Sequence, residues 1–175
     1  MSPFVVPYDS RWPARFEQER LALVDAMGDR LVDDVQHIGS TAIPGLLSKP
    51  ILDMIAGVAD LADAARSAES LRALGYEEHS HRLDAVLFIG TDHGVDTRHL
   101  HLTVPGSELW RERLAFRDAL RADPSLLDEY RALKLRLLNE SSNGSYDSSG
   151  KREFVRRVLV SVGVELRDDL HVGDG

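Results

Sequence analysis

Apolar residues recur along the chain at spacings that differ between segments, and these spacings predict the order of its helices and strands. Residues 10–27 place apolar side chains on one face of a helix. Residues 32–38 and 51–58 are expected to be strands, and the second is almost entirely apolar, as in a strand that is buried on both faces. A further helix is expected over residues 60–74, because Gly75 is suited to end it in a left-handed conformation.

The rest of the chain predicts further strands and then a helical end. Short apolar runs favour three strands, at residues 76–79, 83–89 and 98–104, with a turn at 91–96. Helical spacing in the last third favours three helices, at residues 107–120, 124–137 and 151–162, with a polar loop at 141–150. This order predicts an α/β (α+β) fold, a mixed β-sheet flanked by helices with a helical C-terminal part. We expect one domain over residues 1–163 and a flexible tail over 164–175.

Composition narrows the classes of function. The chain has 175 residues, with 21 Lys and Arg against 29 Asp and Glu, and a formal net charge of −8. An acidic chain is a poor binder of nucleic acid, which needs clustered cations. There is no cysteine, so thiolate metal sites and cysteine nucleophiles are excluded. Neither a signal peptide nor a membrane-spanning apolar run is evident, so we expect a cytoplasmic protein with no membrane partner and leave its oligomeric state open.

The segment from Gly39 to Lys49 has the composition of a loop that holds phosphate. Gly39 allows a sharp turn after a strand, and the small residues Ser40 and Thr41 offer N–H groups and hydroxyls to an anion. Lys49 adds a positive charge at the far end of the loop. These four residues are therefore candidate nucleotide-binding residues.

Asp53 lies in the middle of an otherwise apolar strand. A buried carboxylate costs free energy unless it is paired, hydrogen-bonded or bound to a metal, and a functional role is one reason to keep it there. In the alternative interpretation, Asp53 bonds to Lys49 or to backbone N–H groups and only holds the loop.

His99 and His101 occupy alternate positions of a predicted strand, so their side chains share one face. Two imidazoles at this spacing can bind a divalent metal with a third ligand such as Asp53 or His37. Alternatively, each histidine hydrogen-bonds a neighbour.

Basic residues on the predicted C-terminal helices are a last group of candidates. Arg117 and Lys134 can clamp phosphates if these helices fold over the sheet, and they join the candidate nucleotide-binding residues. Arg121 and Lys151 are considered with them. The alternative is that all four lie on solvated helix faces.

Four segments of the chain resemble the GrpB family of bacterial proteins: YDSRWPARFEQE, HIGSTAIPGLLSKPILD, RHLHL and LAFRDALRADPSLLDEYRALK. The resemblance covers about residues 5–160. It implies a nucleotidyltransferase-like fold, in which a Gly-Ser turn holds a triphosphate and two carboxylates on the next strand hold Mg²⁺. Gly39 and Ser40 match the turn, and Asp53 matches the first carboxylate.

The second carboxylate of that pattern falls at Ile55, which cannot bind a metal. Either His99 and His101 complete the site, with His101 joining Asp53 as a catalytic residue, or the protein binds a nucleotide without transferring it. The resemblance therefore implies three hypotheses. The first is a Mg²⁺-dependent transfer of a nucleotidyl group to a small acceptor. The second is a module that binds a nucleotide or a coenzyme A precursor, and the third is another metal-dependent reaction at Asp53, His99 and His101.

Overall fold

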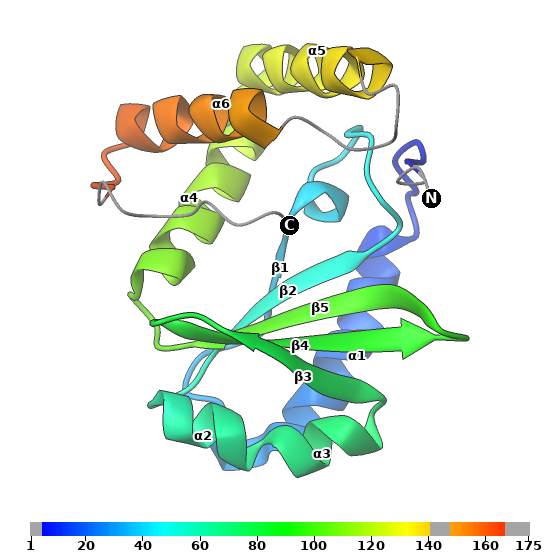
Figure 1. Ribbon diagram of the computed structural model, residues 1–175, viewed down its shortest axis with the longest axis vertical. Helices are drawn as coiled ribbons and strands as arrows, with labels where there is room; N and C mark the ends of the chain where they lie inside the picture. Colours follow the sequence, from blue (N-terminus) through cyan, green and yellow to red (C-terminus); the bar gives the residue numbers. More distant parts are fainter. Residues whose placement is uncertain (1–4, 141–147, 167–175) are drawn as a thin grey trace.

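A five-stranded mixed β-sheet forms the centre of the computed structural model, which describes residues 5–140 and 148–166 (Figure 1). The strands are β1 (Gln36–Ile38), β2 (Leu52–Gly57), β3 (Tyr76–His81), β4 (Ala85–Asp92) and β5 (Val95–Thr103). Their order is β1-β2-β5-β4-β3, in which β2 and β5 are parallel and the other neighbours are antiparallel. The predicted mixed sheet is confirmed.

Helices cover both faces of this sheet, as Figure 1 shows. One face packs against α1 (Trp12–Met27), α2 (Leu61–Arg66) and α3 (Ala68–Ala73). The other lies toward α4 (Glu108–Ala122), α5 (Pro124–Glu140) and α6 (Ser148–Ser161), which form the predicted helical C-terminal part. Two short 3₁₀ helices, η1 (Gly28–Arg30) and η2 (Ser40–Ala42), follow α1 and β1.

The side chains of β2 alternate between the two faces. Leu52, Met54 and Ala56 belong to the main core with α1, α2 and α3. Asp53 and Ile55 point to the opposite face, toward the C-terminal helices. There, Ile55 packs in a small apolar cluster whose other buried members are Ile38, Ala85 and Leu109. Asp53 therefore lies on the face of the sheet that α4 covers.

Several predicted boundaries were wrong for local reasons. The helix expected over 60–74 is divided at Ser67, whose hydroxyl donates to the carbonyl of Asp63 at 2.8 Å. The strand expected over 32–38 is limited to β1. The turn expected over 91–96 is shorter, because β4 extends to Asp92 and β5 begins at Val95. The two residues between these strands, His93 and Gly94, adopt positive φ angles of 54° and 77°.

The last helix begins earlier than expected, since α6 starts at Ser148, inside the predicted loop over 141–150. Residues 141–147 of that loop and residues 167–175 of the predicted tail lie outside the described residues, so the tail stays a prediction. Within residues 5–140 and 148–166, no helix combines the length and the apolar character that crossing a membrane requires.

Candidate functional site

The turn after β1 lies directly against the carboxylate of Asp53. Gly39 has a φ of +69°, which favours glycine. A Cβ atom at Gly39 would lie 2.5 Å from Oδ2 of Asp53, well inside van der Waals contact. Glycine is therefore needed at this position both for its backbone conformation and for the space that its missing side chain leaves to Asp53.

Asp53 is buried, with 9% of its surface exposed. Nδ1 of His99 lies 3.2 Å from Oδ1, within ion-pair range, and Oδ1 has no well-aligned hydrogen-bond partner among the described residues. Burial by itself would raise the pKa of the Asp53 carboxyl, but the close polar contact with His99, and then His101 and the guanidinium of Arg113, hold this pKa below its ordinary value. Asp53 is thus an ionised carboxylate with acceptor capacity to spare.

Lys134 of α5 bonds to the loop that follows β1. Its Nζ donates to the hydroxyl of Ser40 at 2.8 Å and to the carbonyl of Leu47 at 2.5 Å. Burial, and then the charge of Lys151, lower the pKa of Lys134 to about 7. This lysine fastens both ends of the loop rather than facing the pocket described below.

Arginines of α4 and α5 bond to other carbonyls of β1 and of this loop. Arg117 donates to the carbonyl of His37 at 3.1 Å, and Arg121 donates to the carbonyl of Ala42 at 2.9 Å. Arg131 donates to the carbonyl of Gly45 at 3.0 Å. Basic side chains of α4 and α5 thus position the loop, a role that the sequence analysis did not foresee.

Thr41 and His37 support the loop from the opposite side of the sheet. Thr41 is buried and donates its hydroxyl to the carbonyl of Ile51 at 3.1 Å, while Nε2 of His37 donates to Thr41 at 3.0 Å. The imidazole of His37 stacks on Phe16 of α1, at 4.8 Å between ring centroids. His37 therefore lies on the face away from Asp53, and its prediction as a third metal ligand was wrong.

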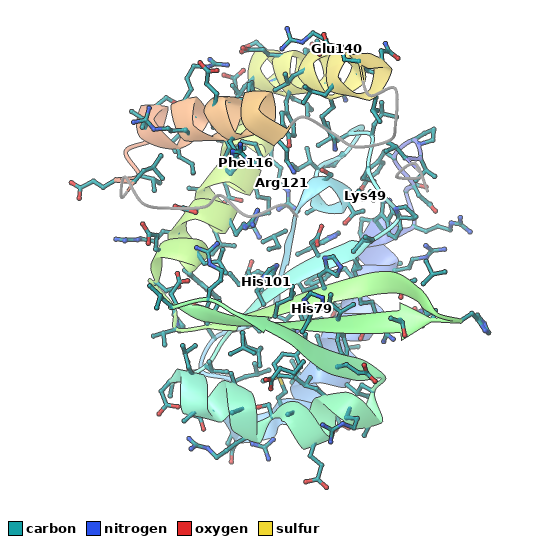
Figure 2. The ribbon with its side chains drawn as sticks, in the orientation of Figure 1. Lys49, His79, His101, Phe116, Arg121 and Glu140 are labelled. Carbon is teal, nitrogen blue, oxygen red and sulfur yellow. The ribbon has the colours of Figure 1, made fainter. Side chains whose placement is uncertain are left out.

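A pocket opens where this turn meets the C-terminal helices. Its volume, including the open mouth, is about 830 Å³. Figure 2 shows His101 on the side of the sheet toward α4, α5 and α6, and Phe116 on α4, just below α6. Six candidate residues line the pocket: Gly39, Ser40, Asp53, His101, Arg117 and Lys151. The remaining candidates, which are Thr41, Lys49, His99, Arg121 and Lys134, do not line it.

The structure adds pocket residues that were not predicted from the sequence. Glu112 and Arg113 lie on α4, and Arg152 lies on α6, next to the candidate residue Lys151. Helical spacing relates Glu112 and Arg113 to Phe116 and Arg117, one turn later, so the sequence contained a signal. It did not say which face of α4 meets the sheet, because that depends on packing between distant segments.

The donors present do not form the two-carboxylate set that a pair of Mg²⁺ ions requires. Ile55 is fully buried and apolar, and within the described ranges no group of three His, Asp or Glu side chains is arranged to hold a metal ion. His101 can accept a bond, since burial and then the charge of Arg113 lower its pKa to about 3 and keep it neutral. Metal binding by Asp53, His99 and His101 stays a prediction.

Comparison with known proteins connects this arrangement to other chains. The family model described as "GrpB protein" matches residues 2–160. A UPF0157 protein of Streptomyces coelicolor is 37% identical over 91% of this chain and 84% of its own length. A crystal structure of the conserved protein GrpB from Enterococcus faecalis has a TM-score of 0.79 at 25% identity, covering 91% of this chain and 99% of that chain. A Dephospho-CoA kinase of Mycolicibacterium paratuberculosis is 30% identical over 82% of this chain and 41% of that protein.

Replacing Gly39 with alanine tests whether the turn depends on its contact with Asp53. We expect Gly39→Ala to lower the free energy of unfolding by roughly 2–5 kcal/mol, because a strained positive φ and an overpacked carboxylate both contribute. Gly94→Ala is the matched control, since Gly94 also has a positive φ but no atom within 4 Å of the added Cβ. It should cost only about 1–2 kcal/mol in chemical denaturation. Equal losses in both variants would contradict the contact.

His101 makes stability depend on pH in a direction that its pKa fixes. The imidazole pKa is near 6.5 in the unfolded chain and about 3 in the folded one, so between these values the unfolded state binds more protons and stability falls as pH falls. From pH 7 to pH 5, the wild type should lose roughly 2 kcal/mol more than His101→Gln, measured by urea unfolding at each pH. Identical losses in the two proteins would show that His101 is not buried in neutral form.

Proposed function

The chain belongs to the GrpB family, and on this premise we propose that its pocket binds the phosphate groups of a nucleotide or a related phosphorylated small molecule. The observation that carries the proposal is the Gly39–Ser40 turn, which lines a pocket together with basic side chains. The nucleotidyltransferase-like fold implied by the family places a phosphate-holding turn at the same point.

The charge of the pocket is opposite to that of the whole chain. Its lining holds two carboxylates, Asp53 and Glu112, and four basic side chains, which are Arg113, Arg117, Lys151 and Arg152. The whole chain carries a formal charge of −8. A concave site with excess positive charge on an acidic protein attracts small anions selectively, while the remaining surface repels extended polyanions such as nucleic acid.

Apolar side chains complete the pocket and favour an organic ligand over a bare ion. Phe116, Tyr130, Ile43 and Val155 line it beside the charged groups. The rings of Phe116 and Tyr130 meet edge to face, at 5.4 Å between centroids. Pockets for cofactors and substrates combine apolar surface with a few polar groups in this way. The proposed ligand therefore has phosphates for the turn and a less polar part for this surface.

Transfer of a nucleotidyl group is a second candidate function, and Asp53 is the observation that favours it. An ionised, buried carboxylate whose Oδ1 has no hydrogen-bond partner among the described residues can accept the proton of an attacking hydroxyl in this pocket. His101 lines the same pocket and is neutral, but it is the weaker candidate for that role, because an imidazole whose pKa is about 3 holds a proton poorly at neutral pH. Binding without transfer fits the present donors better, because Ile55 removes the second carboxylate.

A connection to coenzyme A metabolism is a third point to test. A chain like this one forms part of a longer protein named Dephospho-CoA kinase. Dephospho-coenzyme A carries a diphosphate, which suits the basic side of the proposed pocket, and an adenosine, which suits its apolar side. It is therefore a reasonable ligand to compare with ATP.

Arg152→Met tests the phosphate site through binding of inorganic tripolyphosphate, ATP and dephospho-coenzyme A in EDTA. We expect wild-type protein to be stabilised by its ligand without Mg²⁺, and the variant to bind roughly tenfold or more weakly, as for the loss of one charge-assisted hydrogen bond. Arg156→Met is the matched control, because Arg156 lies on the same helix but does not line the pocket. Thermal shift and calorimetry give both readouts. No binding of any probe, or an equal loss in both variants, would refute the proposal.

Asp53→Asn distinguishes transfer from binding alone. If the chain only binds, neither protein should release pyrophosphate from nucleoside triphosphates in the presence of Mg²⁺ or Mn²⁺, and the variant should bind ATP at least as tightly, because a negative charge beside the phosphates is gone. Release of pyrophosphate by the wild type, abolished in Asp53→Asn, would establish the second candidate instead.

A further inference from the structure

One pocket residue has no structural role that the fold explains. Glu112 lies on α4 with only 5% of its surface exposed, and it lines the pocket. Its Oε1 atom is buried and has no hydrogen-bond partner among the described residues. A buried carboxyl oxygen left without a partner costs free energy, and more when the group is charged, so replacement by an apolar residue is expected to stabilise the protein.

The surroundings of Glu112 do not remove this cost. Burial, and then the charge of Glu108, raise the pKa of the Glu112 carboxyl, while Arg113 and Arg82 lower it and Asp84 raises it further. The lowering effect of the two arginines on this pKa is therefore opposed by burial and by the two neighbouring carboxylates. Unpartnered buried groups of this kind are rare in native proteins and call for an explanation such as a ligand.

The position of Glu112 relates it to the proposed phosphate site. Arg117 lies five residues later on α4 and donates to the carbonyl of His37, in β1, two residues before Gly39. Five residues of α-helix rise about 7.5 Å. Glu112 therefore lies nearer the N-terminal end of α4 than Arg117 does, and it lines the same pocket, so a group on the remainder of a bound molecule can reach it while the phosphates are at the turn.

We propose that Glu112 accepts a hydrogen bond from a hydroxyl or amino group on the nucleoside part of the ligand and so selects for that part. The inference rests on the proposed phosphate-binding function and adds a second contact point to it. Both possible donors share one chemistry, an O–H or N–H group directed at a carboxylate, and they lie on the sugar and on the base respectively.

A structural role and a ligand-binding role predict opposite effects when the carboxyl group is removed. If Glu112 only supported the fold, Glu112→Leu would lower the melting temperature. If it is held in place for a ligand, the same substitution should raise the melting temperature of the ligand-free protein, because it removes an unpartnered polar group from the interior.

The experiment measures binding of two probes, ATP and inorganic tripolyphosphate, to the wild type, Glu112→Leu, Glu112→Gln and Glu108→Gln. We expect both Glu112 variants to bind ATP about tenfold to hundredfold more weakly, as for the loss of a hydrogen bond to a charged group. Their affinity for tripolyphosphate, which has no nucleoside, should change less than twofold. Glu108→Gln removes the same charge from the same helix outside the pocket lining and should leave both affinities unchanged.

Two analogues then locate the donor. The penalty of Glu112→Gln should disappear with 2′,3′-dideoxyadenosine triphosphate if the donor is a sugar hydroxyl, and with inosine triphosphate if it is the amino group of the base.

Four results would overturn the inference. Equal effects of Glu112→Leu on ATP and tripolyphosphate would assign Glu112 to the phosphate end or to the fold. Unchanged ATP affinity with a lowered melting temperature would make it structural. Failure of the wild type to bind either probe would refute the proposed function itself, and with it this inference, whereas normal binding of tripolyphosphate with no Glu112 effect on ATP refutes the inference alone.

Discussion

The contact between the backbone of Gly39 and the carboxylate of Asp53 is the constraint on which the site depends. Any side chain at Gly39 would occupy the volume that Oδ2 of Asp53 already fills. The contact joins the residue after β1 to the start of β2, and these strands are antiparallel neighbours in which Ile38, the last residue of β1, pairs with Asp53, the second residue of β2. The turn can therefore present Ser40 to the pocket only where the carboxylate also enters it, and the two features form one unit.

Basic side chains fix this unit from the helical side. Four of them each donate to a carbonyl of the segment from residue 37 to residue 47: Arg117, Arg121, Arg131 and Lys134. Carbonyl groups in an irregular loop have no regular partners, and burying them unpaired would cost free energy. By bonding them, α4 and α5 hold the loop in one conformation and become attached to the sheet. The helical C-terminal part is thus a support for the site as well as its cover.

The sequence predicted the parts of this site that are local and missed those that depend on distant contacts. Gly39, Ser40 and Asp53 could be recognised because a glycine turn beside an acid in an apolar strand is unusual within a short stretch of chain. The role of Lys134 could not, since its partners Ser40 and Leu47 are about ninety residues away and only the packing of α5 brings them together. His37 was misplaced for a related reason: the register of β1 against β2 aligns it with Met54, on the core face.

Ile55 shows why the site has this balance of charge. It is fully buried against Leu109 of α4, in the cluster that packs this helix on the sheet. A carboxylate at that position would lie in an apolar contact, where its desolvation would be uncompensated. The same packing brings the next turn of α4, with Glu112 and Arg113, to the pocket, and the charge of Arg113 acts on Asp53. An apolar residue at position 55 therefore does more than delete a metal ligand. It anchors α4, and the guanidinium of Arg113 on this helix supplies a positive charge that acts on Asp53. This arrangement favours anion binding by side chains over binding through a pair of metal ions.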